Sequence, residues 1–594
     1  MAAGGEEIYR GVPASPGIII GSTRSLSRDV ENVAADRIVD TVIEKETFRN
    51  AISQVKKRLE KTAAKVFERL GPEYARIFEA QVMIAGDEVW NKNVEKRIEK
   101  EKICAEYIYH NESKKVIKQL GNSNDAYLRE RIQDIEAVTG RLVSRMRGEK
   151  RVTLKNFKGA TVLVARYLTP GDILALSVRR NLGFATGIGG TTSHTALIAK
   201  SLSVPAVVGL GGIAEEILSG QRVIIDGYRG LFIVNPSAST IKKYRQLKKS
   251  ESQLKRQLAQ LKDKAAVTKD GFKVDILANI ELPNEVPKVI SAGASGIGLY
   301  RTEYLFLART EFPTFDEQYR AYSSILRRMG KKPVVIRTFD LGGDKFPGAT
   351  GKNYQLNPFL GWRAIRVCLD RPDIFKIQLK ALLKASRWGN LSIMIPMISN
   401  YEELVKTKEI IEECKQEFRK KRMRFSENIP LGVMLEVPSA VLIAEHLADE
   451  VDFFSIGTND LIQYTMAVDR GNELLAELYQ SFHPSVLSLV KSAVSAAHGS
   501  RLKVSVCGEM AADPIGAVLL AGLGVDELSV SFQSVGIIKK IIKSISYTGA
   551  RQIAENALKM RSHAEINAYL KSEFELHFPE LKPVFQFMGR NSDG

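Results

Sequence analysis

Residues 452–461, Asp-Phe-Phe-Ser-Ile-Gly-Thr-Asn-Asp-Leu, place a short apolar run directly before a polar loop, and this pattern decides the fold of the C-terminal half. Residues 453–456 have the length and composition of a buried strand. Similar strand candidates, with helical segments between them, recur at 274–280, 296–300, 333–337, 393–397, 432–435, 504–506 and 527–530. Eight strand–helix units are what a (β/α)8 TIM barrel requires, so we predict such a barrel.

Ionisable side chains gather at the ends of these predicted strands. In a TIM barrel the chemistry lies where the strands end and the loops to the helices begin. The residues at those ends are Asn279, Arg301, Glu303, Arg337, Asp340, Glu436, Asn459, Asp460, Cys507 and Glu509. Packing does not account for so many polar groups on one rim, so we predict an active site there.

The carboxylates and the arginines of this rim suit an anionic substrate and a metal ion. Glu436 and Asp460 come from different strands and supply the hard oxygen ligands that Mg²⁺ prefers, with substrate oxygens and water completing the octahedron. Two arginines can grip a phosphate and a carboxylate bidentately, and Arg366 or Arg470 is a candidate to join them.

Two further rim residues have less specific chemistry. Asn459 is suited to hold a carbonyl or phosphate oxygen of a substrate. Cys507 is a lone thiol at a strand end, and such a cysteine is more often a small buried residue than a catalyst. Beside Glu509 and a bound metal, Cys507 becomes a candidate for proton transfer.

The N-terminal half changes its pattern twice. Residues 8–21 combine turn residues with one strand, and residues 30–147 carry long amphipathic helical patterns. Residues 151–236 return to short β-rich runs interleaved with helices. Because a strand precedes the helical stretch and more strands follow it, we predict a helical subdomain inserted into an α/β domain.

A linker connects the two halves. Residues 241–264 are rich in lysine and glutamine and lack glycine and proline, which predicts a semi-rigid helical spacer. A short coiled-coil contact is the alternative. The predicted domains are the α/β domain (1–30 and 148–238), the inserted helical subdomain (31–147), the linker (239–265), the barrel (266–560) and a tail (561–594).

Residues 189–196, Gly-Gly-Thr-Thr-Ser-His-Thr-Ala, place His194 in the first turn of a predicted helix, directly after a strand at 182–186. A helix N-terminus offers free N–H groups and partial positive charge, which favour a phosphate carried on the ring. His194 is therefore a candidate phosphoryl carrier. The alternative is a Ser-His pair that only caps the helix.

Composition limits the class of protein. The 594 residues carry a net charge of +18, but the basic residues are scattered among acids, with no aromatic-interleaved stripe or nucleic-acid motif. No apolar run is long enough to span a membrane. Four cysteines without paired short spacing predict a reducing compartment, the cytoplasm. The remaining histidines, His110, His446, His483, His498, His563 and His577, lack metal-ligand spacing, and His483 is the one expected nearest the rim.

Six motifs in order carry a resemblance over nearly the whole chain. They are the stretch at 189–196, Gly-Leu-Tyr-Arg-Thr-Glu at 298–303, Ile-Arg-Thr-Phe-Asp-Leu-Gly-Gly-Asp-Lys at 336–345, Asn-Pro-Phe-Leu-Gly-Trp-Arg at 357–363, the stretch at 452–461, and Cys-Gly-Glu-Met at 507–510. Together they resemble the enzyme I family of the bacterial phosphoenolpyruvate-dependent phosphotransferase system. The resemblance implies a swivelling α/β phosphohistidine domain with an inserted helical bundle, a helical linker and a C-terminal TIM barrel.

The resemblance also implies an activity and its residues. His194 would take a phosphoryl group from phosphoenolpyruvate bound in the barrel and pass it to a histidine of the carrier protein HPr, which the helical subdomain binds. The implied residue roles are Mg²⁺ binding by Glu436 and Asp460, phosphate binding by Arg301 and Arg337, further substrate contacts by Asn459, Asp460 and Arg470, and proton donation by Cys507. Family members dimerise through the barrel, so a homodimer is expected.

Some positions depart from the family pattern. Thr191 and Gly187 stand where arginine and aspartate are usual, and Tyr167 replaces an acid while Thr169 remains. Residues 78–88 are less acidic than the usual surface for a basic HPr face. These departures are expected to affect partner affinity more than phosphoryl uptake.

Three other interpretations compete with this one. A nitrogen-regulatory branch of enzyme I is expected to carry a sensory domain at the N-terminus, and none is seen in the sequence. A phosphoenolpyruvate synthase or pyruvate phosphate dikinase shares the phosphohistidine and barrel parts but needs an ATP-binding region, and no glycine-rich phosphate loop occurs here. A non-catalytic scaffold would not need the complete set of rim residues. The enzyme is therefore the favoured interpretation.

Overall fold

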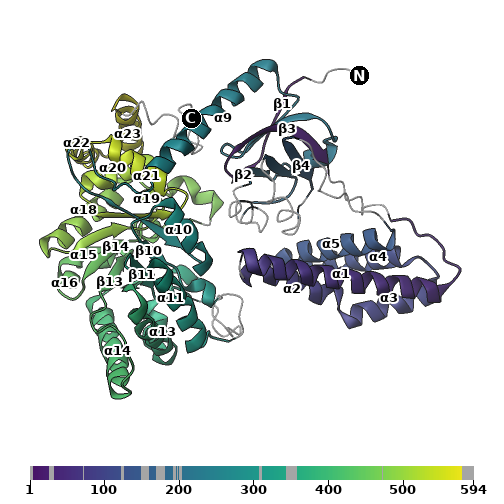
Figure 1. Cartoon of the computed structure of the whole chain (residues 1–594), viewed down its shortest axis with the longest axis horizontal. Coiled ribbons are helices and arrows are strands. Elements are labelled where there is room, and N and C mark those ends of the chain that lie inside the picture. Colours follow the sequence, from purple (N-terminus) through teal and green to yellow (C-terminus); the bar gives the residue numbers. More distant parts are fainter. Residues whose placement is uncertain are drawn as a thin grey trace. The chain divides into compact units, whose positions relative to one another are not determined.

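The chain folds into two compact units in a computed structural model, one running to Glu251 and the other beginning at Ser252 (Figure 1). The structure describes residues 5–25, 33–70, 72–121, 126–148, 159–166, 168, 181–190, 196, 199, 204–306, 311–342, 357–470 and 472–577. Each unit is described by itself below.

An eight-stranded sheet organises the first unit. Its order is β1-β8-β7-β3-β4-β5-β6-β2, with β3 to β6 parallel and the other pairs antiparallel. The strands are β1 (Glu7–Arg10), β2 (Val12–Ser15), β3 (Ile18–Ser25), β4 (Thr161–Ala165), β5 (Leu182–Thr186), β6 (Ala206–Val208), β7 (Arg222–Asp226) and β8 (Leu231–Val234). Strands β4 to β6 are buried along their whole length, as continuous apolar strands of a parallel sheet should be.

The two edge strands β1 and β2 were not expected from the sequence, which suggested only turns before residue 18. Both are four residues long, and β2 contains Pro13. Proline cannot donate to a ladder and is tolerated at a sheet edge, where β2 pairs with β6. These strands form because they pair with β8 and β6, and their own sequences contain little that predicts a strand.

A helical bundle is inserted in the chain between two strands that are neighbours in this sheet. Residues Ser22 to Ser25 of β3 pair with Thr161 to Val164 of β4, although the whole bundle separates them in the chain. The bundle helices are α1 (Thr41–Leu70), α2 (Pro72–Ala85), α3 (Glu88–Glu101), α4 (Ala105–Gly121) and α5 (Ala126–Met146). The predicted insertion of a helical bundle into an α/β domain is confirmed.

Helix α9 (Ala238–Gln260) spans the division between the two units, and it covers most of the predicted linker. Within the first unit, Tyr244 donates its hydroxyl to Asp226 Oδ2 at 3.1 Å. Beyond the helix, the buried Lys539 donates to the carbonyls of Leu261, Lys262 and Gly293 at 3.4, 2.8 and 2.6 Å. Each end of this connection is therefore tied to its own unit.

The second unit is a closed parallel barrel with helices outside it (Figure 1). Its strands are β9 (Asp275–Ile280), β10 (Ile297–Tyr300), β11 (Pro333–Arg337), β12 (Asn390–Ile395), β13 (Leu431–Leu435), β14 (Phe453–Ile456), β15 (Lys503–Val506) and β16 (Glu527–Ser531). The predicted eight-stranded TIM barrel is confirmed. Strand β12 ends earlier than expected because Pro396 has no N–H for the ladder and Met397 turns away with a φ of 61°.

Further helices lie in the described ranges of the two units. They are α8 (Ile213–Glu216), α10 (Val286–Ala292), α11 (Phe315–Met329), α12 (Ile365–Asp370), α13 (Pro372–Ala385), α14 (Tyr401–Lys420), α15 (Pro438–Leu442), α16 (Ala444–Ala448), α17 (Thr458–Met466), α18 (Pro484–Gly499), α19 (Glu509–Ala512), α20 (Pro514–Leu523), α21 (Val535–Ser544), α22 (Tyr547–Ala557) and α23 (His563–His577). Short 3₁₀ helices occupy Pro283–Glu285, Glu303–Leu305, Pro358–Leu360, Ser386–Trp388 and Glu473–Leu478. No helix within the described ranges is long and apolar enough to cross a membrane.

Candidate active site

The predicted site residues stand at the carboxyl ends of the barrel strands. Arg337 is the last residue of β11, Glu436 follows β13, and Cys507 follows β15. Asn459 and Asp460 lie in the first turn of α17, directly after β14. Because all eight strands are parallel, these ends share one rim.

Glu436 is the most unusual of these groups because it is a buried carboxylate in which only one of the two oxygens accepts a hydrogen bond. Oε1 accepts the backbone N–H of Met397 at 2.7 Å, whereas Oε2 is buried and has no hydrogen-bond partner among the described residues. Burial and the nearby Asp460 and Asp340 raise the pKa of Glu436 well above its usual range. Such an oxygen is expected to have a ligand in the functional protein.

A divalent cation fits this place. Glu436 and Asp460 are close enough for each charge to be felt by the other, and carboxylate oxygens are what Mg²⁺ takes, often only one or two from the protein. The residues described contain no cluster of three or more metal-ligating side chains, so substrate and water would supply the other ligands. Gly457 keeps this space open, because a Cβ there would lie 2.8 Å from Glu436 Oε2.

Arg337 is held rigidly beside these carboxylates. Its Nη2 donates to Glu303 Oε1 at 3.0 Å, and its Nη1 lies 3.3 Å from Asp340 Oδ2. The side chain is almost fully buried, and its Nε has no hydrogen-bond partner within the described ranges. A buried arginine with one unused donor is well prepared to receive an anionic oxygen.

Arg363 joins this network, although the sequence did not single it out as a site residue. Its Nε and Nη2 form a bidentate pair with Asp340 at 3.0 and 2.8 Å, and its Nη1 lies 3.5 Å from Asp460. Burial would raise the pKa of Asp340, but Arg337 and Arg363 outweigh that effect and lower it. The signal was present, because Arg363 ends the motif at 357–363.

Cys507 lies deep in the barrel mouth. Its Sγ is 3.7 Å from the carbonyl oxygen of Ile456 and packs with Leu299, Met394 and Met434. Burial raises the pKa of this thiol, so it carries its proton at neutral pH. Asn279 steadies the loop by donating to the Cys507 carbonyl at 3.1 Å, which gives that rim amide a structural role.

Asn459 and Glu509 are hydrogen-bonded to each other. The Glu509 N–H donates to Asn459 Oδ1 at 2.9 Å, and Asn459 Nδ2 lies 3.5 Å from Glu509 Oε1. The pair joins the loops after β14 and β15.

Among the described residues, the side chains of Arg301 and Arg470 form no hydrogen bond or ion pair with the buried network. Arg301 pairs with Glu281 at 2.9 Å on the more exposed side of the rim. Arg470 is exposed, and its backbone N–H donates to Gln463. Arg366 instead donates to the carbonyls of Leu360 and Gly361, and His483 caps α18, so both have structural roles here.

His194 lies outside the described residues, together with Thr191, Tyr167 and Thr169. The neighbouring Gly187 is described and buried, directly after β5. A Cβ at this position would come within 2.6 Å of the Gly211 carbonyl oxygen. The backbone therefore has no room for the aspartate that the family pattern would place there.

Comparison with known proteins covers nearly the whole chain. Residues 10–131, 157–230 and 255–547 match the N-terminal, mobile and PEP-binding domains of PEP-utilising enzymes. The phosphoenolpyruvate-protein phosphotransferase of Bacillus sp. (strain S) is 40% identical over 96% of this chain and 99% of its own length. The proteins of that name from Bacillus subtilis and Haemophilus influenzae are 39% and 40% identical, over 95% and 94% of this chain and 99% and 98% of their own lengths.

Proposed function

The chain belongs to the phosphoenolpyruvate-protein phosphotransferases, and from this premise we propose that it takes the phosphoryl group of phosphoenolpyruvate onto His194 and passes it to a histidine of HPr. The observation that carries the proposal is the unpartnered Glu436 oxygen beside Asp460 and two buried arginines at the barrel rim. This arrangement suits a phosphorylated carboxylic acid together with Mg²⁺.

The rim residues would bind and orient the substrate. Arg337 has an unused Nε donor for a phosphate oxygen, and Arg301 supplies a second cation from the neighbouring strand end. Asn459 and Arg470 are assigned to the remaining substrate oxygens. Glu436 and Asp460 would hold Mg²⁺, which supplies charge neutralisation for the phosphoryl group and the departing enolate.

The chemistry divides between two residues of this chain. A neutral ring nitrogen of His194 attacks phosphorus in line, the bond from phosphorus to the enol oxygen breaks, and that oxygen keeps the electron pair. The buried thiol of Cys507 then gives its proton to the methylene carbon, which forms the methyl group of pyruvate. Solvent returns a proton to the thiolate when pyruvate leaves.

The phosphoryl transfer requires movement. His194 belongs to the α/β domain, whereas the substrate binds at the barrel, so the domain must swivel to reach first the barrel and then HPr. Helix α9 is the connection across which this movement occurs. We assign HPr docking to the bundle of α1 to α5, dimerisation to the barrel, and the enzyme to the cytoplasm.

Labelled phosphoenolpyruvate tests this proposal directly. Wild-type protein incubated with Mg²⁺ and substrate carrying a labelled phosphate should acquire one acid-labile label, and His194→Ala should acquire none. His577→Ala, at the exposed end of α23, is the matched histidine control and should label normally. Equal labelling of His194→Ala and wild type would overturn the assignment.

A further inference from the structure

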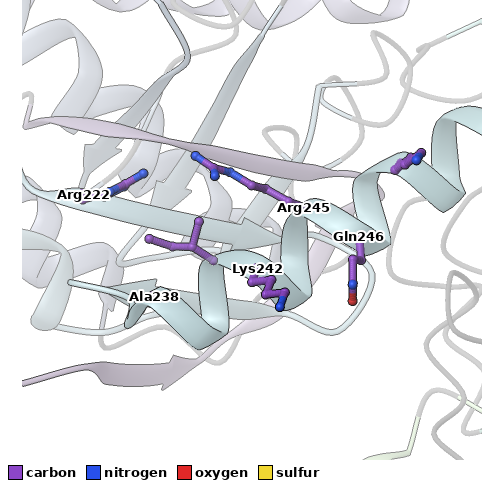
Figure 2. Close-up of a pocket in the computed structure, with 7 residues that line it drawn as sticks. Arg222, Ala238, Lys242, Arg245 and Gln246 are labelled. Atoms are coloured by element: carbon purple, nitrogen blue, oxygen red, sulfur yellow. The ribbon is translucent and has the colours of Figure 1, made fainter.

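A hollow of about 440 Å³ lies beside the first turns of α9, entirely within the first unit. Arg222 at the start of β7 and Lys242, Arg245 and Lys249 of α9 line it. In Figure 2 the side chains of Arg222 and Arg245 extend toward each other from the strand and the helix. Four exposed cations therefore line this open hollow, which we call the linker pocket.

The geometry of α9 keeps these cations together. Lys242, Arg245 and Lys249 are three, four and seven residues apart, so they lie on one face of the helix. Like charges at these spacings repel each other and destabilise a helix. The helix cannot rotate them apart, because Ile241 and Tyr244 are buried against the sheet domain and Tyr244 is hydrogen-bonded to Asp226.

No carboxylate in the part of the chain that the structure describes forms an ion pair with the linker pocket. Within the described ranges, none of its four cations has an ion-pair partner. The acids on the adjoining segments have other partners. Glu6 accepts the Ser237 N–H at 2.5 Å, Glu251 accepts the Tyr228 hydroxyl at 3.0 Å, and Asp226 accepts the Tyr244 hydroxyl at 3.1 Å.

We propose that the linker pocket binds a compact polyphosphate anion, as free pyrophosphate or as the phosphate chain of a nucleotide. Two guanidinium groups match the planar arrangement of phosphate oxygens, and two lysines add charge without demanding a fixed geometry. A diphosphate carries several negative charges, which offset most of the charge of the four cations, and a volume of 440 Å³ admits it with room for part of a nucleoside. Gln246 adds an uncharged donor and acceptor at the wall.

The consequence is a ligand that bridges β7 and α9. Such a ligand fastens the first turns of the connecting helix to the sheet of the first unit. The linker pocket is lined by residues of the first unit, none of which belongs to the barrel rim, and its ligand would bind whether or not His194 accepts a phosphoryl group.

Calorimetric titration of the full chain with pyrophosphate tests the proposal. Lys242→Gln combined with Arg245→Gln removes two pocket cations and keeps good helix formers. Lys243→Gln combined with Lys248→Gln makes the same charge change on the same helix, at residues that do not line the pocket. We expect the pocket variant to bind at least about tenfold more weakly and the control to bind within about twofold of wild type.

Two additions complete the test. Arg222→Gln approaches the pocket from β7 and should weaken binding as well, and thermal melts verify that each variant is folded. ATP in place of pyrophosphate distinguishes the two sources, since tighter binding of ATP identifies a nucleotide and equal binding identifies the phosphates alone. Absence of binding by wild type to both ligands, or equal affinities of the pocket and control variants, overturns the proposal.

Discussion

The barrel rim and the linker pocket both contain arginines, but only the rim arginines are paired with carboxylates of the described chain. At the rim, Arg337 is paired with Glu303 and Asp340, and Arg363 is paired with Asp340 and approaches Asp460. At the linker pocket, Arg222 and Arg245 have no such partner in the described ranges. Burial explains the difference, because a charge removed from water must be neutralised by the fold, whereas a charge at the surface is hydrated and screened.

The difference separates two ways of preparing for an anion. The rim arginines are held in place by their carboxylates before a ligand binds. Their side chains are therefore preorganised, but the carboxylates neutralise part of their positive charge. The linker pocket offers its full charge but holds long, exposed side chains that a ligand must order. The rim is therefore suited to chemistry and the pocket to reversible binding.

Removal of the Glu436 charge should have the largest effect. Glu436→Gln keeps the shape but withdraws the carboxylate with the unpartnered oxygen, so we expect pyruvate release with Mg²⁺ to fall by about 10³-fold. Stability should not fall, since a buried charge disappears. Glu402→Gln, an exposed acid in the first turn of α14, is the control. An unchanged rate in Glu436→Gln would remove this residue from the site.

The buried ion pairs should give the next largest effect. Asp340→Asn leaves Arg337 and Arg363 without their shared counter-charge, so we expect the free energy of unfolding in urea to fall by about 3 kcal/mol. Asp373→Asn removes an equally bidentate pair with Arg371 at an exposed place and should cost less than about 1 kcal/mol. Equal losses would show that burial does not distinguish the two pairs.

The smallest effect should have the opposite sign. Arg245→Glu places an acid between Lys242 and Lys249, so at low ionic strength we expect it to raise the free energy of unfolding by about 0.5 kcal/mol. Lys243→Glu has no lysine or arginine three or four residues away and should change little. A gain that persists undiminished at about 0.5 M salt would mean that charge repulsion is not its cause.

The rim could be predicted residue by residue because barrel topology requires chemistry at strand ends. Arg337, Glu436, Asn459, Asp460 and Cys507 all follow that rule and stand at the expected ends. The rule gives only the position along the chain, and contacts depend on packing. The sequence predicted the same role for Arg337 and Arg301, but in the structure Arg337 is buried and Arg301 is more exposed.

Residues outside that rule were harder to predict. Arg363 belongs to the segment before α12 and does not follow a strand, so the rule for strand ends does not predict it. The cations of α9 are visible in the sequence at helical spacing, but Arg222 joins them only because β7 packs beside the helix. Edge strands β1 and β2 likewise depend on partners far along the chain.

The pairing of β3 with β4 across the helical bundle has a consequence for synthesis on the ribosome. Strand β3 emerges early, but its parallel neighbour follows only after α1 to α5 have been made. The bundle consists of contacts between helices near in sequence and can form quickly, whereas closing the sheet demands a long-range contact. Until β4 and β7 arrive, the apolar residues Ile18 and Ile19 remain exposed, so the nascent chain passes through a stage that is vulnerable to aggregation.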